Sequence, residues 1–208
     1  MFVEDTGPTF KPVPAGMHLA RCYRIIDVGT QKSEFEGNVK FLHKIKLVWE
    51  VHGNDEDGNP MVTDKGEPMI VTKDYTLSWA EKATLRLDLQ SWRGKPFSDE
   101  EQRRFDLKAL LDKWCMVNVT HKAKKKGNGV YSNVTAVTPV PSALKTSLPK
   151  GHNPCKVFQI SEPDMELFDT FSDYLKKQLQ ESPEWKAVQG RPKDTGSGFD
   201  DLPDDIPF

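Results

Sequence analysis

A stretch of alternating residues from Val39 to Val51 constrains the fold of this chain more than any other segment. Its odd positions carry the apolar side chains Val39, Phe41, Ile45, Leu47, Trp49 and Val51. Its even positions carry the charged side chains Lys40, Lys44, Lys46 and Glu50. A period of two predicts a long β-strand with one face in the core and a basic outer face. We therefore expect Phe41 and Trp49 to be core residues.

Other segments continue the β-rich pattern. The strands predicted from β-branched and aromatic content cover residues 16–28, 39–51, 69–79, 114–122 and 130–138. Polar residues and turn formers predict loops at 29–38 and 54–67, and an Asn-Gly turn follows three lysines between the last two strands. Residues 139–159 are rich in proline and are also predicted to be a loop.

Helical spacing appears in two parts of the chain. After Ser78, a plausible N-cap, residues 79–92 carry apolar side chains near helical spacing. Two short helices are expected to follow, one after a capping box at Ser98 and one over residues 106–113. Residues 164–180 predict a C-terminal helix with an apolar stripe, which packs on the strands or against a second copy of the chain.

The element order is three strands, a helical insertion and a two-stranded hairpin. This is the order of an oligonucleotide-binding (OB) fold, a five-stranded, partly open Greek-key barrel. The predicted class is therefore mainly β with helical insertions (α+β), followed by a C-terminal helix and a disordered acidic tail. A generic small β-barrel with helices gives much the same element order and stays open as an alternative.

Charge is distributed unevenly along the 208 residues. The net charge is −2, but residues 194–208 hold five aspartates and no Lys or Arg. The remaining 193 residues carry 29 Lys and Arg against 26 Asp and Glu, a balance of +3. A basic body with an acidic appendage fits a surface that binds polyanions.

Several observations predict a cytoplasmic protein, in the host cell if the gene is phage-encoded. No stretch approaches the roughly 20 apolar residues of a membrane span, and the first residues lack the pattern of a signal peptide. The three cysteines, Cys22, Cys115 and Cys155, are widely spaced and odd in number, which fits a reducing compartment.

The last nine residues alternate aspartates with prolines and end in Ile-Pro-Phe. This peptide predicts a flexible docking segment whose recognition needs an apolar pocket, a basic residue for the terminal carboxylate and a positive rim. Its partner-binding residues are Asp200, Asp201, Asp204, Asp205, Ile206, Pro207 and Phe208. The sequence closely resembles the C-terminal peptide of bacterial and phage single-stranded DNA-binding proteins. An acidic solubilising tail is the alternative interpretation.

Residues 79–141 also look like the phage-encoded group of these proteins, notably at 89–97, 105–108 and 131–134. The resemblance implies an OB-fold that binds single-stranded DNA in residues 1–141. A loop and helix would follow in 142–189, and a linker with the docking tail in 190–208. It further implies a protein that coats DNA during replication, recombination or repair. The tail would recruit a helicase, primase, nuclease or polymerase.

Binding single strands without sequence preference requires cations for phosphates and aromatic faces for bases. The cationic candidates are Lys40, Lys44, Lys46, Lys73, Lys122, Lys124, Lys125 and Lys126. The stacking candidates are Tyr75, Trp79 and Tyr131, although Trp79 and Trp92 also fit as plugs of the barrel end. For each lysine, a solvated strand face is the alternative.

No catalytic motif is present, so we expect a protein that is not an enzyme and needs no cofactor or metal. The possible zinc ligands Cys115, His121, His152 and Cys155 match no common spacing. Two other functions remain open: a recombination protein that anneals strands, and an interaction module that mimics the tail without binding DNA.

Overall fold

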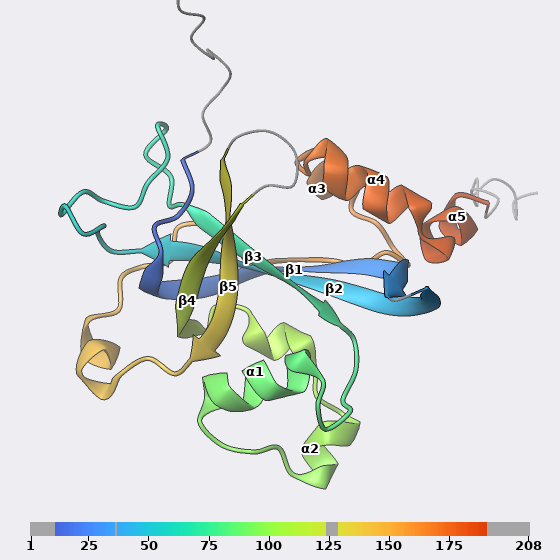
Figure 1. Ribbon diagram of the computed structural model, residues 1–208, viewed down its shortest axis with the longest axis horizontal. Coiled ribbons are helices and arrows are strands. Elements are labelled where there is room, and N and C mark those ends of the chain that lie inside the picture. Colours follow the sequence, from blue (N-terminus) through green and yellow to red (C-terminus); the bar gives the residue numbers. More distant parts are fainter. Residues whose placement is uncertain (1–10, 36, 124–128, 191–208) are drawn as a thin grey trace, which may run out of the picture.

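The alternating segment forms the second strand of a twisted sheet in the computed structural model, which describes residues 11–35, 37–123 and 129–190 (Figure 1). This strand, β2 (Asn38–His52), pairs in antiparallel fashion with β1 (Gly16–Phe35). The loop predicted at residues 29–38 is wrong, because residues 29–35 continue β1 and pair with the first half of β2. Their polar character fits a strand here, since side chains such as Lys32 and Glu34 are exposed to solvent.

The sheet has the strand order β3-β2-β1-β4-β5. Strands β3 (Ile70–Thr76), β4 (Trp114–Ala123) and β5 (Val130–Thr138) lie where the sequence predicts strands, and all neighbours on this path are antiparallel. The sheet curls until β3 and β5, its two ends, contact each other. Within the described ranges no hydrogen-bonded ladder joins β3 to β5, so the sheet is open. The fold is mainly β with several helices, as predicted.

A sixth strand, β6 (Lys156–Phe158), pairs in parallel fashion with residues Arg24–Ile26 of β1. It lies inside the segment predicted to be a loop, as does the 3₁₀ helix η2 (Ser142–Ser147). The loop predicted at residues 139–159 is therefore wrong at these two places. Three residues are too few to show a period, so the proline-rich surroundings dominate the sequence pattern.

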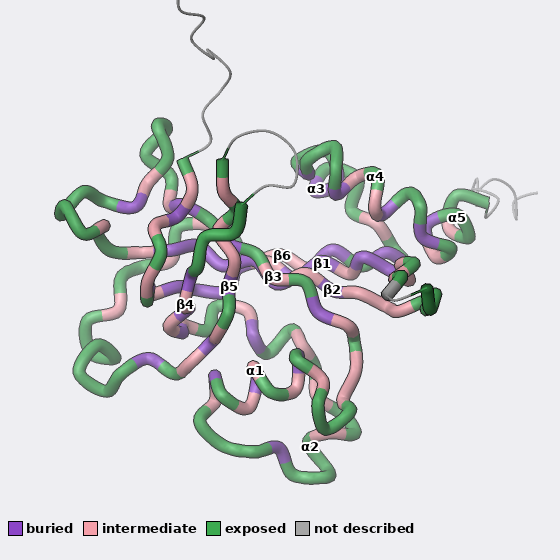
Figure 2. The backbone as a smooth tube through the Cα atoms, viewed as in Figure 1, coloured by how far each residue is buried: buried purple, intermediate pink, exposed green. Residues whose placement is uncertain are grey.

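The first hydrophobic core lies between the inner face of the sheet and helix α1 (Thr84–Arg93). Trp49 is fully buried there, as predicted, with its ring centroid 6.1 Å from that of Trp92. Burying one large apolar side chain stabilises a fold by about 1.5–3 kcal/mol. Figure 2 shows buried residues along the central strands and exposed residues at the hairpin ends.

The insertion between β3 and β4 contains α1, α2 (Asp99–Arg103) and the 3₁₀ helix η1 (Leu107–Leu110). Ser98 forms the predicted capping box with Glu101 at the start of α2. Helix α1 begins at Thr84 rather than at Trp79, because the Ser78 hydroxyl accepts a hydrogen bond from the Ala80 amide instead of capping the helix. Residues 79–83 are therefore not helical, and a turn at residues 81–82 leads into α1.

The predicted C-terminal helix is divided into α3 (Met165–Asp169) and α4 (Asp173–Glu181), and α5 (Pro183–Gln189) follows. The division occurs where the Ser172 hydroxyl accepts a hydrogen bond from the Leu175 amide and so starts a new helix. The apolar stripe packs on β1, and a second core forms there around the fully buried Phe158 of β6. Figure 1 shows α3–α5 and α1–α2 on opposite sides of the β1–β2 strands. No helix in the described ranges could span a lipid bilayer.

Candidate nucleic-acid interface

The outer face of β2 carries the lysines that the sequence predicts, but two of them already have partners on β3. Lys44 and Thr76 are opposite each other in the ladder, and the Lys44 Nζ atom donates a 2.9 Å hydrogen bond to the Thr76 hydroxyl. Lys46 forms an ion pair with Asp74, its cross-strand neighbour. The positive charge of this face is therefore partly neutralised, and Lys46 is a weaker phosphate ligand than the exposed Lys40.

A groove of about 490 Å³ runs beside Lys44, between the end of β3 and the start of α1. Lys44 and Lys82 supply its two cations, and Asp74 is its acidic residue. Hydroxyl side chains complete the polar lining: Thr76, Ser78 and Thr84. Hydroxyls and ammonium groups are common ligands of backbone phosphates, so the groove suits a sugar-phosphate chain.

Lys73 and Tyr75 do not lie on the surface with Lys44. Both point from β3 toward α1, where the Lys73 Nζ and Tyr75 hydroxyl donate hydrogen bonds of 2.6 and 2.8 Å to Asp88 Oδ2. Burial, together with the negative charge of Asp88, raises the pKa of the Tyr75 hydroxyl well above its usual range. Only 2 % of Tyr75 is exposed, so its ring is not accessible to a base, contrary to the prediction.

Trp79 is also packed against other side chains. Its ring lies edge-on to Phe97 at 5.0 Å and to Phe105 at 5.6 Å, between centroids. This aromatic cluster adjoins the first core, and Trp92 is buried in that core. The alternative role, a plug at the end of the sheet, describes both tryptophans better than base stacking does.

The β4–β5 hairpin brings one predicted aromatic and one predicted cation together. Lys122 and Tyr131 are directly opposite in the ladder, so their side chains lie on the same face of the hairpin. Lys122 is exposed, and 56 % of Tyr131 is exposed. Lys124, Lys125 and Lys126 at the hairpin tip lie outside the described residues. The partner-binding residues Asp200, Asp201, Asp204, Asp205, Ile206, Pro207 and Phe208 lie outside them as well.

Phe41 is the functional candidate that the sequence misplaced. The alternating pattern put it in the core, but 71 % of it is exposed on the β1–β2 hairpin. The reason is that β3 pairs with β2 only over residues 44–50, so the hairpin extends beyond the core. Phe41 faces Lys32 across the ladder and follows the exposed Lys40. The sequence gives one signal that Phe41 lies beyond the core, namely the charged or polar residues around it: Lys40 before it, and His43 and Lys44 after Leu42.

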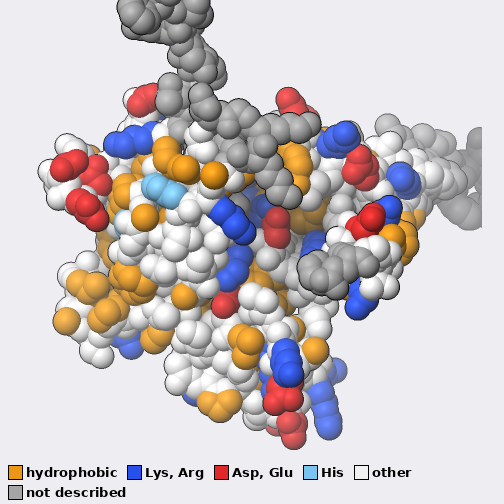
Figure 3. All heavy atoms as spheres, in the orientation of Figure 1, with side chains coloured by type: hydrophobic (Ala, Val, Ile, Leu, Met, Phe, Trp, Pro, Cys, Tyr) orange, Lys and Arg blue, Asp and Glu red, His pale blue; other side chains and the backbone are white. Residues whose placement is uncertain are grey.

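The two hairpins thus have the same arrangement, an exposed aromatic ring directly opposite a lysine. Figure 3 shows Lys and Arg side chains on the face over β3 and β5, with acidic side chains beside them. Aromatic rings stack on bases and cations neutralise phosphates, which together bind a single strand independently of its sequence.

The described residues hold no group of three or more His, Cys, Asp and Glu side chains that could bind a metal ion. Burial raises the pKa of the Cys22 thiol to about 12, and that of Cys115 well above its ordinary value. Both thiols therefore stay protonated at neutral pH, where a thiolate is the nucleophilic form.

No protein-family model matches this chain, and no curated protein matches it either.

Proposed function

We propose that this protein binds single-stranded DNA with little sequence preference and protects it during phage replication or recombination. One observation carries the proposal: Phe41 on one hairpin and Tyr131 on the other are exposed rings, each opposite a lysine. Exposing large aromatic rings to water is unfavourable, and stacking on bases relieves that cost. Lys122 brings positive charge to the ring of Tyr131. Lys32, opposite Phe41, pairs with Glu34 at 3.6 Å, so the exposed Lys40 beside Phe41 is the better cation on that hairpin.

We further propose that the first five strands form an OB-fold. The strand order β3-β2-β1-β4-β5 and the contact between β3 and β5 support this assignment. OB-folds bind oligonucleotides on the second and third strands and on the loops that join strands 1–2 and 4–5. With this assignment, the groove beside Lys44 and the two aromatic hairpins would correspond to those binding positions.

The acidic residues 200–208 are proposed to recruit a replication or repair enzyme. Their sequence combines charge with the apolar Ile206 and Phe208, which suits a partner with an apolar pocket and a basic rim. Deletion of residues 206–208 is expected to abolish recruitment and to leave the affinity for single-stranded DNA unchanged or slightly higher. A clear fall in that affinity would count against this division of roles.

The direct test is fluorescence anisotropy of the full chain with a labelled oligothymidine and with a duplex of equal length. We expect tight, salt-sensitive binding to the single strand and much weaker binding to the duplex. No binding to either would favour an interaction module that acts through its tail alone. A strand-annealing protein would in addition pair complementary oligonucleotides, which a fluorescence-transfer assay detects.

A further inference from the structure

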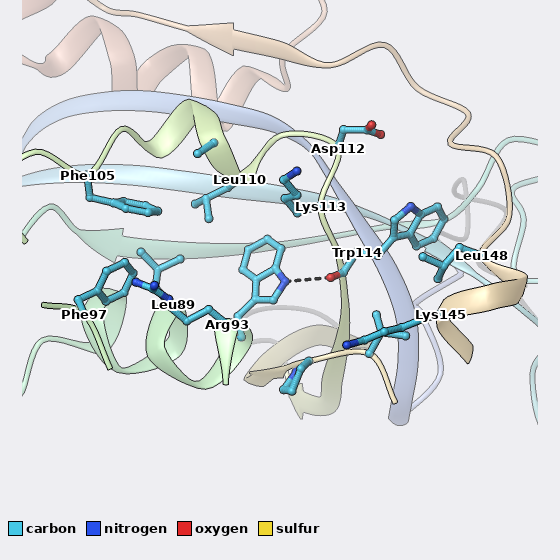
Figure 4. A pocket seen from close by; sticks show the side chains of 14 residues that line it. Leu89, Arg93, Phe97, Phe105, Leu110, Asp112, Lys113, Trp114, Lys145 and Leu148 are labelled. Atoms are coloured by element: carbon cyan, nitrogen blue, oxygen red, sulfur yellow. Dashed lines mark hydrogen bonds between the residues drawn. The ribbon is translucent and has the colours of Figure 1, made fainter. Parts of the chain in front are cut away.

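An apolar pocket of about 560 Å³ opens between α1, η1, the start of β4 and η2 (Figure 4). It lies away from the hairpins of the proposed DNA site. Its apolar lining includes Leu89, Trp92, Phe97, Leu110, Val140 and Leu148. Trp92 lines the pocket, and its Nε1 atom donates a 2.9 Å hydrogen bond to the Trp114 carbonyl. A volume of about 300–1,000 Å³ is typical of pockets that enclose a ligand.

Four charged residues line this pocket, and two of them have a partner of opposite charge within the protein. The Arg93 guanidinium donates two hydrogen bonds to the Glu101 carboxylate, at 3.1 and 2.7 Å. Asp112 accepts a 2.8 Å hydrogen bond from Arg21, whose guanidinium also pairs with the buried Glu50. Lys113 and Lys145 are the other two charged residues.

Both lysines are exposed, and no side-chain ion pair or hydrogen bond within the described ranges involves either of them. Figure 4 shows Lys113 and Leu110 on one side of the pocket and Lys145 on another. The site therefore combines apolar walls with two positive charges that lack a partner among the described residues. It is suited to a ligand that carries both apolar groups and negative charge.

We propose that residues 200–208 of the same chain dock in this pocket. Ile206 and Phe208 would fill the apolar part, and Asp204 and Asp205 would lie against Lys113 and Lys145. The segment and the pocket are therefore complementary in apolar surface and in charge. Exposed pairs of opposite charge contribute little affinity in water, so burial of the two apolar side chains would supply most of it.

The segment is long enough to reach the pocket. Asp204 lies fourteen positions after Gly190, the C-cap of α5, and an extended chain of that length spans up to about 50 Å. A compact body of this size has a radius of gyration of about 16 Å. The span is therefore sufficient, even though α5 and α1 lie on opposite sides of the β1–β2 strands.

This inference goes beyond the proposed function, since docking in the pocket requires neither DNA nor a partner. Its consequence is that the pocket and a partner protein compete for the same residues. The free protein would hold its acidic segment in the pocket, and recruitment would require release of that segment.

A photo-crosslinking experiment tests the docking in the full chain without DNA. Phe208 is replaced by p-benzoylphenylalanine, the sample is irradiated, and the crosslinked residues are mapped by mass spectrometry. We expect crosslinks to gather on residues 89–97, 110–114 and 140–148. The double variant Lys113→Glu, Lys145→Glu should reduce their yield at least about fivefold, because like charges then face the aspartates.

The matched control is Lys150→Glu with Lys177→Glu, which reverses two exposed lysines outside the pocket and should leave the yield unchanged. A second variant, Leu148→Asp, tests the apolar wall without altering the lysines and should also lower the yield. Crosslinks on the β1–β2 or β4–β5 hairpins, an even spread over the surface, or yields insensitive to the double variant would overturn the proposal. Crosslinks between isotopically labelled and unlabelled copies would overturn docking within one chain. None of these outcomes depends on whether the protein binds DNA.

Discussion

Arg21 and Glu50 face each other across the β1–β2 ladder, and the Arg21 Nε atom donates a 2.8 Å hydrogen bond to Glu50 Oε1. The Glu50 carboxylate is fully buried and also accepts hydrogen bonds from the backbone amides of His152 and Asn153. This pair therefore fastens the segment before β6 to the central strands. Gly151 is required at this point, since a Cβ atom there would lie 2.0 Å from the Arg21 guanidinium carbon.

Removing one member of the pair should strongly destabilise the fold. Arg21→Met leaves the Glu50 carboxylate buried without its cation, a change that typically costs about 3–5 kcal/mol. The free energy of unfolding in urea measures the loss. Lys177→Met is the control, because its ion pair with Glu181 is exposed and its removal should cost less than about 0.5 kcal/mol. Equal losses in the two variants would contradict the structural role of Arg21.

The Glu50 carboxylate should make the free energy of unfolding depend on pH. Burial alone would raise the pKa of Glu50, but the hydrogen bonds from Arg21, the Asn153 amide and His52 outweigh it and lower that pKa from 4.5 to about 2. A lowered pKa stabilises the folded state above pH 4.5, and this stabilisation is lost as the pH falls from 4.5 through 2. Urea unfolding across this range should show a shallower loss in Glu50→Gln. Parallel curves for the two proteins would exclude Glu50 as the source.

Replacing the exposed aromatic rings should weaken DNA binding without affecting the fold. Base stacking on an aromatic ring contributes about 1–3 kcal/mol in proteins that bind single strands, so Phe41→Ala and Tyr131→Ala should each raise the Kd for oligothymidine about 5- to 150-fold. Fluorescence anisotropy measures the change. Tyr174→Ala is the matched control, because 71 % of Tyr174 is exposed, the same fraction as for Phe41, but it lies on α4. An equal loss with Tyr174→Ala would remove both hairpins from the site.

The salt dependence of binding should separate lysines that have partners from those that are available to DNA. Each phosphate contact with a single strand contributes about 0.7 to the slope of log K against log salt concentration. Lys40→Gln, Lys122→Gln and the joint neutralisation of Lys124–Lys126 should lower the slope, whereas Lys46→Gln should change it little because Asp74 already pairs with Lys46. Titrations over a range of salt concentrations measure these slopes. A larger change of slope in Lys46→Gln than in Lys40→Gln or Lys122→Gln would show that Lys46 contacts DNA despite its ion pair with Asp74.

Tyr75→Phe should affect stability and leave DNA binding unchanged. The change removes the hydrogen bond to Asp88 but keeps the buried ring, so the free energy of unfolding should fall by about 0.5–1.5 kcal/mol. The Kd for oligothymidine should stay at its original value, since the ring is inaccessible. A marked rise in that Kd would restore Tyr75 as a stacking residue.

The positions of β3, β4 and β5 could be predicted from the sequence because β-branched and aromatic residues gather there, next to turn formers. The alternation in β2 misplaced Phe41, since a period of two shows which residues share a face but not where the core ends. That limit depends on how far β3 extends along β2, which is a tertiary property.

Among the site residues, Lys122 and Tyr131 could be assigned to the two strands of one hairpin, but their direct pairing follows from the register of the folded ladder. The burial of Tyr75 could not be predicted, because Asp88 reaches it only after α1 packs on β3. The apolar pocket beside α1 could not be predicted from the sequence for the same reason, that it depends on tertiary packing. Its walls come from segments more than fifty residues apart that meet only in the folded chain.

Strand β6 has a consequence for how the chain folds. Its parallel pairing with β1 joins residues more than a hundred positions apart in the sequence, whereas the β1–β2 and β4–β5 ladders are local. Closing so long a loop is entropically slow, so we expect the hairpins to form first and α3–α5 to dock last. The helices around Phe158 pack in a core separate from the first, so we expect them to open as a cooperative unit and their amides to exchange hydrogen faster than those of the central strands. The chain would therefore unfold in two stages, with the C-terminal lobe detaching before the sheet.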